Sequence, residues 1–194
     1  MPDGRPHVVV HVATGLDATV RGFEVDLGDF YALAARFHED VTLVGADTVL
    51  AQEESLASAA PGPGPNPAGP LLAVVDSRRR VSAWDALRDA GYWRDVRALR
   101  GQGQERVDLR AALAELAAEG AGVVRVDSGG GLVGALLRLG LVDEVSLVVH
   151  PSAGVGGPWT GGAQGLRFEL LASEPRDRGL VWLRYAVVAG DPRP

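Results

Sequence analysis

Residues 124–151 have the sequence VRVDSGGGLVGALLRLGLVDEVSLVVHP, which is the pattern of a strand, a glycine-rich turn, a helix and a second strand. Residues 124–126 predict a buried strand, and the polar pair Asp127 and Ser128 follows at its carboxyl end. Residues 145–149 predict the second strand. The helix between them is predicted from four apolar positions, namely Leu132, Leu136, Leu137 and Leu139.

Three consecutive glycines, Gly129, Gly130 and Gly131, lie where the helix is expected to begin. Glycine lets a backbone pass close to a ligand, and the free N–H groups and positive dipole end of a helix N-terminus suit an anion such as a pyrophosphate. A tight turn that needs positive φ is the alternative interpretation. The motif predicts a phosphate site only if further features support it.

Strands and helices alternate along the rest of the chain. Strands are predicted at residues 7–13, 41–44, 71–75 and 96–99, helices at 29–38, near Asp47, at 84–90 and after the capping residue Asp108, and a final hairpin at 167–172 and 180–188. The proline- and glycine-rich segment 59–70 predicts a surface loop or a mobile flap.

This alternation predicts an α/β fold with a mainly parallel central sheet, helices on both faces and a C-terminal antiparallel hairpin. Ligands of such sheets bind at the carboxyl ends of strands. Polar groups follow four predicted strands, at Thr14 and Asp17, at 45–48, at 76–80 and at 127–131. We therefore expect a pocket along that edge of the sheet.

Composition narrows the classes of function. A chain of 194 residues with 46% hydrophobic residues is long enough for one domain, which we expect to span residues 1–194. A net charge of −6 argues against nucleic-acid binding, and no apolar run is long enough to cross a membrane. The absence of cysteine excludes disulfides and thiolate chemistry, so a cytoplasmic location is the default expectation. No compact metal-ligand spacing occurs, and none is expected to be needed.

Residues 5–11, 45–48, 75–78 and 124–151 together resemble the pyrimidine reductase family of riboflavin biosynthesis, the C-terminal domain of the deaminase-reductase. The resemblance covers nearly the whole chain and implies a fold like that of dihydrofolate reductase. It also implies NADPH as cofactor, hydride transfer to a C=N or C=O group of a small molecule, and a homodimer. The apolar residues 181–188 could supply the dimer interface or belong to the core.

The resemblance assigns cofactor contacts to Gly45, Asp47 and Thr48, with helix capping by Asp47 or Thr48 as the alternative. Ser77 and Arg78 open a run of arginines that could hold the 2′-phosphate of NADPH, because guanidinium groups pair well with phosphate. A solvated arginine turn is the alternative there.

The resemblance also places His11 and Asp17 on the substrate side, where they could bind a polar heterocycle or relay a proton. A packed, hydrogen-bonded histidine is the alternative for His11. Asp127 could recognise a ring N–H or amine, or could cap the next helix. Three further residues are assigned to the substrate, namely Thr14, Tyr31 and Arg36, and Arg36 could instead pair with Glu39 or Asp40 on the surface.

Several departures from the family pattern suggest a divergent paralogue. Gly15 and Ala18 replace a serine and a glycine of the first loop, Val133 replaces an asparagine, and the segment between Leu99 and Val107 is short. The serine-proline-arginine run of relatives is absent after Pro151, which suggests a substrate without a ribosyl phosphate. The alternative hypothesis is a protein that has lost cofactor binding and is a cofactor-free acid–base enzyme or a small-molecule binder.

Overall fold

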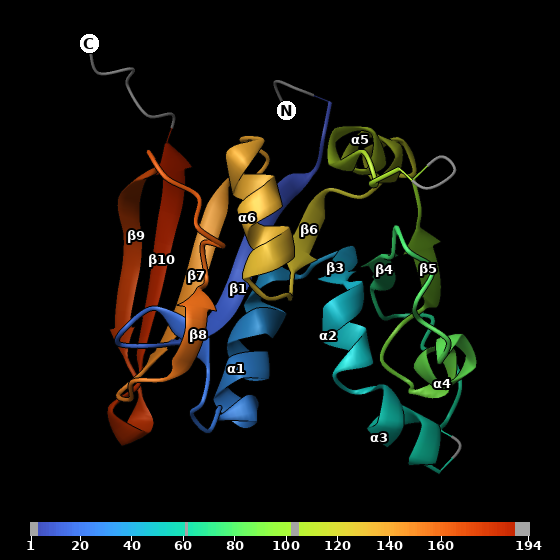
Figure 1. Ribbon diagram of the computed structural model, residues 1–194, viewed down its shortest axis with the longest axis horizontal. Coiled ribbons are helices and arrows are strands. Elements are labelled where there is room, and N and C mark those ends of the chain that lie inside the picture. Colours follow the sequence, from blue (N-terminus) through green and yellow to red (C-terminus); the bar gives the residue numbers. More distant parts are fainter. Residues whose placement is uncertain (1–3, 61, 102–104, 189–194) are drawn as a thin grey trace. The chain divides into compact units, whose positions relative to one another are not determined.

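The computed structural model describes residues 4–60, 62–101 and 105–188 (Figure 1). The chain forms two compact units, the first made of Met1–Pro6 and Glu39–Val124 and the second of His7–His38 and Arg125–Pro194. The chain therefore leaves the second unit after His38 and returns to it at Arg125. The predicted single domain over residues 1–194 stays a prediction.

Three parallel strands form the centre of the first unit, in the order β5-β4-β3. Its apolar core joins these strands to the short helices α2 to α4 through residues such as Val44, Val49, Val74 and Leu87. The elements are β3 (Val41–Gly45), α2 (Ala46–Leu50), α3 (Glu53–Ser58), β4 (Leu71–Val75), α4 (Trp84–Asp89), β5 (Asp95–Leu99) and α5 (Leu109–Ala118).

Four strands form the centre of the second unit, in the order β1-β7-β10-β9. β1 and β7 are parallel, whereas β10 is antiparallel to both of its neighbours. The elements are β1 (His7–Gly15), β2 (Thr19–Arg21), α1 (Leu27–Ala34), η1 (Ala35–Phe37), α6 (Gly130–Arg138), β7 (Glu144–His150), β8 (Val155–Pro158), β9 (Arg167–Pro175), η2 (Asp177–Gly179) and β10 (Val181–Val188). β6 (Val123–Val126) is divided between the two units.

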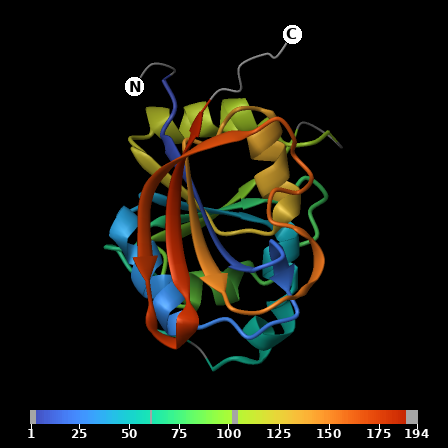
Figure 2. The ribbon, with the colours of Figure 1, turned by 90° about the vertical axis from the view of Figure 1, so that its left-hand side faces the viewer.

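Helices cover both faces of the sheet in the second unit, α1 on one side and α6 on the other (Figure 2). Phe30 and Leu33 of α1 pack on Val148 and Trp182, all of them buried. On α6 the buried positions are Val133, Gly134, Leu136 and Leu137, so the predicted apolar face was wrong at Leu139, which is exposed. Leu139 is the C-cap residue, one position beyond the last helical residue Arg138.

The predicted fold class is confirmed, since parallel strands, flanking helices and a C-terminal antiparallel hairpin are all present. The predicted helix at 29–38 is α1 followed by one turn of 3₁₀ helix, η1, and ends at His38 in a left-handed conformation. The sequence did not predict the small ribbon in which β2 pairs with β8. Within the described ranges, no helix combines the length and apolar character that crossing a bilayer requires.

The proline- and glycine-rich loop has no helix or strand in its described part, as predicted. It packs on the end of α4 and on the segment that follows, where Gly64 N donates to Asp89 O and Asn66 N donates to Trp93 O. A Cβ at Gly69 would lie only 2.2 Å from Tyr92 O, so the loop backbone lies directly against this segment. These contacts favour the surface-loop interpretation over a mobile flap.

Candidate functional site

The glycines at the start of α6 are of two kinds, those that close packing requires and those that have open space around them. A Cβ at Gly130 would lie 2.8 Å from Pro158 O, and one at Gly134 would lie 2.8 Å from Thr160 O. Those glycines are required because the helix packs closely on the loop after β8. At Gly129 and Gly131, in contrast, a Cβ would meet nothing within 4 Å, and neither residue has positive φ. Neither packing nor backbone conformation explains those two glycines.

The start of α6 keeps the features of an anion site. Gly129 is the N-cap residue and has no side chain with which to cap the helix. Asp127 does not cap it either, because its carboxylate pairs with Arg125 at 3.1 Å, so the capping interpretation of Asp127 was wrong. Arg125 is buried in β6, whereas Asp127 remains partly exposed at the end of the strand.

In the first unit, the ends of β3 and β4 are joined by an ion pair between Asp47 and Arg80 at 2.7 Å. Asp47 therefore pairs across to the next strand end and does not cap α2, whose N-cap residue is Gly45. Thr48 lies one position further along the same helix. The structure thus brings together two of the predicted cofactor segments, 45–48 and 77–80, within this unit.

The arginine turn after β4 is organised by a buried carboxylate, Asp76. Its two oxygens accept hydrogen bonds from Arg80 N at 3.0 Å and Val81 N at 3.1 Å. Ser77 Oγ accepts a hydrogen bond from Val107 N at 3.2 Å. Arg78 is exposed, and within the described residues it has no ion pair. The turn therefore presents the guanidinium group of Arg78 on an ordered backbone.

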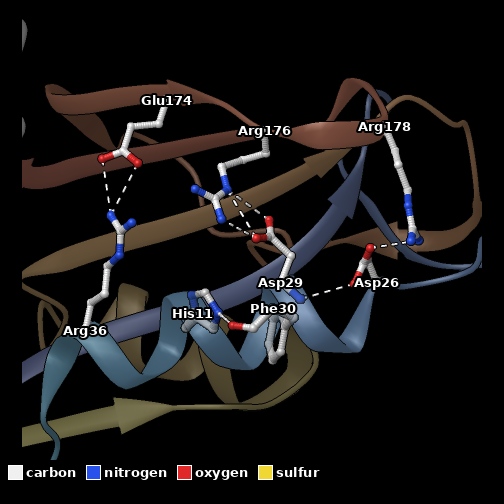
Figure 3. A network of polar contacts seen from close by, with 8 residues as sticks. All are labelled: His11, Asp26, Asp29, Phe30, Arg36, Glu174, Arg176 and Arg178. Atoms are coloured by element: carbon white, nitrogen blue, oxygen red, sulfur yellow. Dashed lines mark hydrogen bonds and ion pairs between the residues drawn. The ribbon is translucent and has the colours of Figure 1, made fainter.

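His11 lies in the core of the second unit and is fully buried. Its Nδ1 lies 2.8 Å from Ser146 Oγ and its Nε2 lies 2.9 Å from the carbonyl oxygen of Phe30 (Figure 3). Burial lowers the pKa of His11 to about 4. These contacts match the alternative interpretation of a packed, hydrogen-bonded histidine. They leave neither ring nitrogen available for a proton relay.

Asp17 stabilises the loop that follows β1 through hydrogen bonds to its carboxylate. Its carboxylate accepts hydrogen bonds from Thr19 Oγ1 at 2.7 Å, from Thr19 N at 3.2 Å and from Gly154 N at 3.0 Å. The hydrogen bond from the Thr19 hydroxyl, together with those from backbone amides, lowers the pKa of Asp17. Thr14 has a similar structural position, since its buried hydroxyl donates to Thr19 O at 3.0 Å. Asp17 is thus a carboxylate held in its charged form.

The helix α1 is tied to the β9–β10 hairpin by three arginine–carboxylate pairs (Figure 3). Arg176 binds both carboxylate oxygens of Asp29, with its Nε at 3.2 Å from each. Its guanidinium group lowers the pKa of Asp29. The other two pairs are Arg178 with Asp26 at 3.0 Å and Arg36 with Glu174 at 3.3 Å.

The predicted surface partners of Arg36, Glu39 and Asp40, were wrong. Arg36 instead reaches Glu174 of β9 and lies over the Trp182 ring, with its Cζ 4.7 Å from the ring centroid. Tyr31, one of the predicted substrate residues, is 52% exposed and contacts Phe30 edge-on. Sequence reasoning missed the carboxylates Asp26 and Asp29, although Asp26 N-caps α1 and its position before an apolar helix could have indicated that role.

Comparisons with known proteins show the family of the chain and its fold. The family model described as RibD C-terminal domain matches residues 6–182. The chain is 28% identical to the riboflavin biosynthesis protein RibD of Corynebacterium ammoniagenes, over 76% of this chain but only 43% of that protein. It is 30% identical to the 2,5-diamino-6-ribosylamino-4(3H)-pyrimidinone 5′-phosphate reductase of Archaeoglobus fulgidus, over 76% of this chain and 81% of that protein.

Among solved structures, the chain is similar to the dihydrofolate reductase of Enterococcus faecalis complexed with NADP(H). The TM-score is 0.61 at 11% identity, and the match covers 95% of this chain and 97% of that one. At this identity the likeness concerns the fold alone, and it confirms the predicted dihydrofolate-reductase-like architecture.

Proposed function

Because the chain belongs to the RibD C-terminal domain family, we propose that it is an NADPH-dependent reductase of a small, heterocyclic metabolite. The reaction transfers a hydride to a C=N, C=O or conjugated C=C group of the substrate. NADPH supplies that hydride when bound, and the protein contributes the binding, the orientation and the surrounding charge.

The proposal rests on one observation, namely that two glycines at the start of α6 have open space where a Cβ would lie. Gly129 and Gly131 are explained neither by packing nor by positive φ, so close approach of a ligand is the remaining reason for glycine there. A helix N-terminus whose N-cap residue has no side chain suits the negative charge of a pyrophosphate. The turn therefore fits the cofactor that the family uses.

The remaining cofactor contacts are assigned in the first unit. Arg78 is exposed, uncompensated among the described residues and set on a turn that Asp76 orders, which suits a 2′-phosphate. Gly45, Asp47, Thr48 and Ser77 belong to the same pair of strand ends, and we keep them as proposed cofactor residues.

On the substrate side, Asp127 is the best-placed carboxylate, because it is partly exposed at the end of β6 and next to the glycine turn. His11 and Asp17 are poorer proton donors, since one is buried and neutral and the other is held as a carboxylate. We therefore assign both to the framework of the site. Tyr31 is exposed and stays a proposed substrate contact.

Titration of the protein with NADPH and with NADH tests the proposal, followed by quenching of its four tryptophans. We expect a preference for NADPH, and we expect Gly131→Ala to weaken binding of both nucleotides at least about tenfold because the added Cβ occupies the ligand's space. Arg78→Ala should weaken only NADPH, by about tenfold or more, through loss of charged hydrogen bonds to the 2′-phosphate.

Gly122→Ala is the matched control. It lies before the amino end of β6, where a Cβ would make an ordinary contact of 3.5 Å with Asp40, and it should bind both nucleotides normally. Absence of binding of either nucleotide to the parent protein would overturn the reductase and leave the cofactor-free enzyme or binder as the working hypothesis. The cytoplasmic location and the homodimer remain predictions.

A further inference from the structure

Gly157 in β8 has the same open surroundings as the two glycines at the start of α6. A Cβ built on Gly157 would meet no atom within 4 Å, and the φ of this residue is not positive. Gly129 and Gly131 share both properties. Because glycine weakens a strand, its presence inside β8 indicates either a bulge or the close approach of another group.

A bulge in the ribbon of β2 and β8 explains Gly156 but not Gly157. The register of the ribbon shifts between Thr19 and Arg21, so that one residue of β2 faces two residues of β8, namely Gly156 and Gly157. In a common type of bulge the first of the two residues is a glycine with positive φ. Gly156 fits this position, since its φ is +99°. The close approach of another group is therefore the explanation that is left for Gly157.

β8 lies directly against the first residue of α6 (Figure 1). A Cβ on Gly130 would lie 2.8 Å from the carbonyl oxygen of Pro158, the last residue of β8. Gly157 is the residue before Pro158, and the Cα atoms of two consecutive residues are about 3.8 Å apart. Gly157 is therefore set beside the glycine turn that the proposed function assigns to the pyrophosphate.

The surface around Gly157 is uncharged and exposed. Residues 151–166 contain no charged side chain, and all four residues of β8 are exposed. Two apolar side chains are exposed there, Val155 at 63% and Leu16 at 73%, and Leu16 N donates to Ser152 O at 2.8 Å. Such a surface offers no charge to a phosphate group. It suits a flat, uncharged ring, which can approach a backbone closely where the Cβ is missing.

We propose that Gly157 positions the nicotinamide ring of NADPH, an inference that rests on the proposed function. The contacts proposed above account for the 2′-phosphate and the pyrophosphate, and they leave the nicotinamide half of the cofactor without an element. One ribose joins the ring to the pyrophosphate, so the ring must lie on an element next to the pyrophosphate site. β8 is such an element, and its uncharged surface matches the ring. A side chain at position 157 would hold the ring away from the backbone of β8.

Calorimetric titration with two ligands tests this assignment. NADPH contains the nicotinamide ring, whereas 2′-phospho-ADP-ribose lacks the ring and keeps the 2′-phosphate, the pyrophosphate and both riboses. We expect Gly157→Ala to weaken NADPH binding at least about tenfold, because the added methyl group overpacks the ring against β8. The same variant should bind 2′-phospho-ADP-ribose as the parent protein does. Gly131→Ala should weaken both ligands, and the control Gly122→Ala should weaken neither.

Thermal unfolding checks that Gly157→Ala acts on the ligand and not on the fold. The Tm of the variant should equal or exceed that of the parent protein, because the methyl group has open space and alanine restricts the unfolded chain. A lower Tm, an unchanged affinity for NADPH, or an equal loss of affinity for both ligands would overturn this inference and leave the proposed function intact. A parent protein that binds neither ligand would overturn both.

Discussion

At the scale of single residues, His11 is held in one tautomer by its neighbours. Trp182 Nε1 can only donate, and it donates to Ser146 Oγ at 2.8 Å, so the Ser146 hydroxyl can donate to His11 Nδ1. The Phe30 carbonyl can only accept, so His11 Nε2 carries the proton. The chain of hydrogen bonds joins β10, β7, β1 and α1, and it requires a neutral imidazole.

This arrangement predicts a loss of stability in mild acid. The pKa of His11 is about 4 in the folded protein, below the value of about 6.5 of an unfolded histidine. Below pH 6.5 the unfolded chain therefore binds a proton that the folded protein cannot bind until about pH 4. The free energy of unfolding should therefore keep its full value above pH 6.5. It should fall by up to about 3 kcal/mol as the pH is lowered from 6.5 to 4.

Urea unfolding at a series of pH values measures this effect. In His11→Gln the fall between pH 6.5 and pH 4 should be smaller, because glutamine does not titrate. His38→Asn is the control, since His38 is exposed and asparagine tolerates its left-handed backbone. An unchanged pH profile in His11→Gln would contradict the predicted origin of the acid sensitivity.

Sequence alone left the roles of these residues open because each depends on contacts distant in the chain. The buried environment of His11 comes from Phe30, Ser146 and Trp182, and no local pattern reveals it. From the sequence, Asp127 could either cap the next helix or recognise a ring N–H or amine of the substrate. Its pairing with Arg125 argues against the capping role. Arg36 pairs with Glu174, which lies 138 residues further along the chain.

At the scale of elements, the glycines of α6 form a packing surface for the loop after β8. Gly134→Ala should destabilise the protein by about 1–3 kcal/mol, because its Cβ would lie 2.8 Å from Thr160 O and 3.0 Å from Gly161 O. Gly131→Ala on the same helix has open space and should be neutral or stabilising by up to about 1 kcal/mol, since alanine favours helix. Thermal unfolding of the two variants makes the comparison. Equal stability would contradict the close helix–loop contact.

Most elements could be predicted from the sequence because their signals are local. Residues 71–75 are β4 as predicted, and Asp108 caps α5 by accepting from Arg110 N and Ala111 N. The ribbon of β2 and β8 could not be predicted, because strands of three and four residues are too short to show an alternation, and β8 also contains two glycines. It forms through distant backbone contacts, such as Trp159 N donating to Ala18 O.

At the scale of the whole molecule, the second unit is assembled from two chain segments that the first unit separates. Asp40 holds the two ends of that intervening stretch together: its N donates to Val123 O at 3.0 Å, and its carboxylate accepts from Gly122 N at 2.8 Å and Val123 N at 2.9 Å. Folding of the first unit thereby closes a long loop, whose closure otherwise costs about 4 kcal/mol of chain entropy.

The two units should therefore unfold together, and Asp40→Ala should destabilise both. Loss of two hydrogen bonds to a carboxylate should cost about 2 kcal/mol and lower Tm by about 4–8 °C, with a single transition retained. Hydrogen exchange should show the loss at amides of β1 and β7, such as Val10 and Val145, although Asp40 belongs to the other unit. Two separate calorimetric transitions, or unchanged protection of β1 and β7, would show that the units fold independently of this closure.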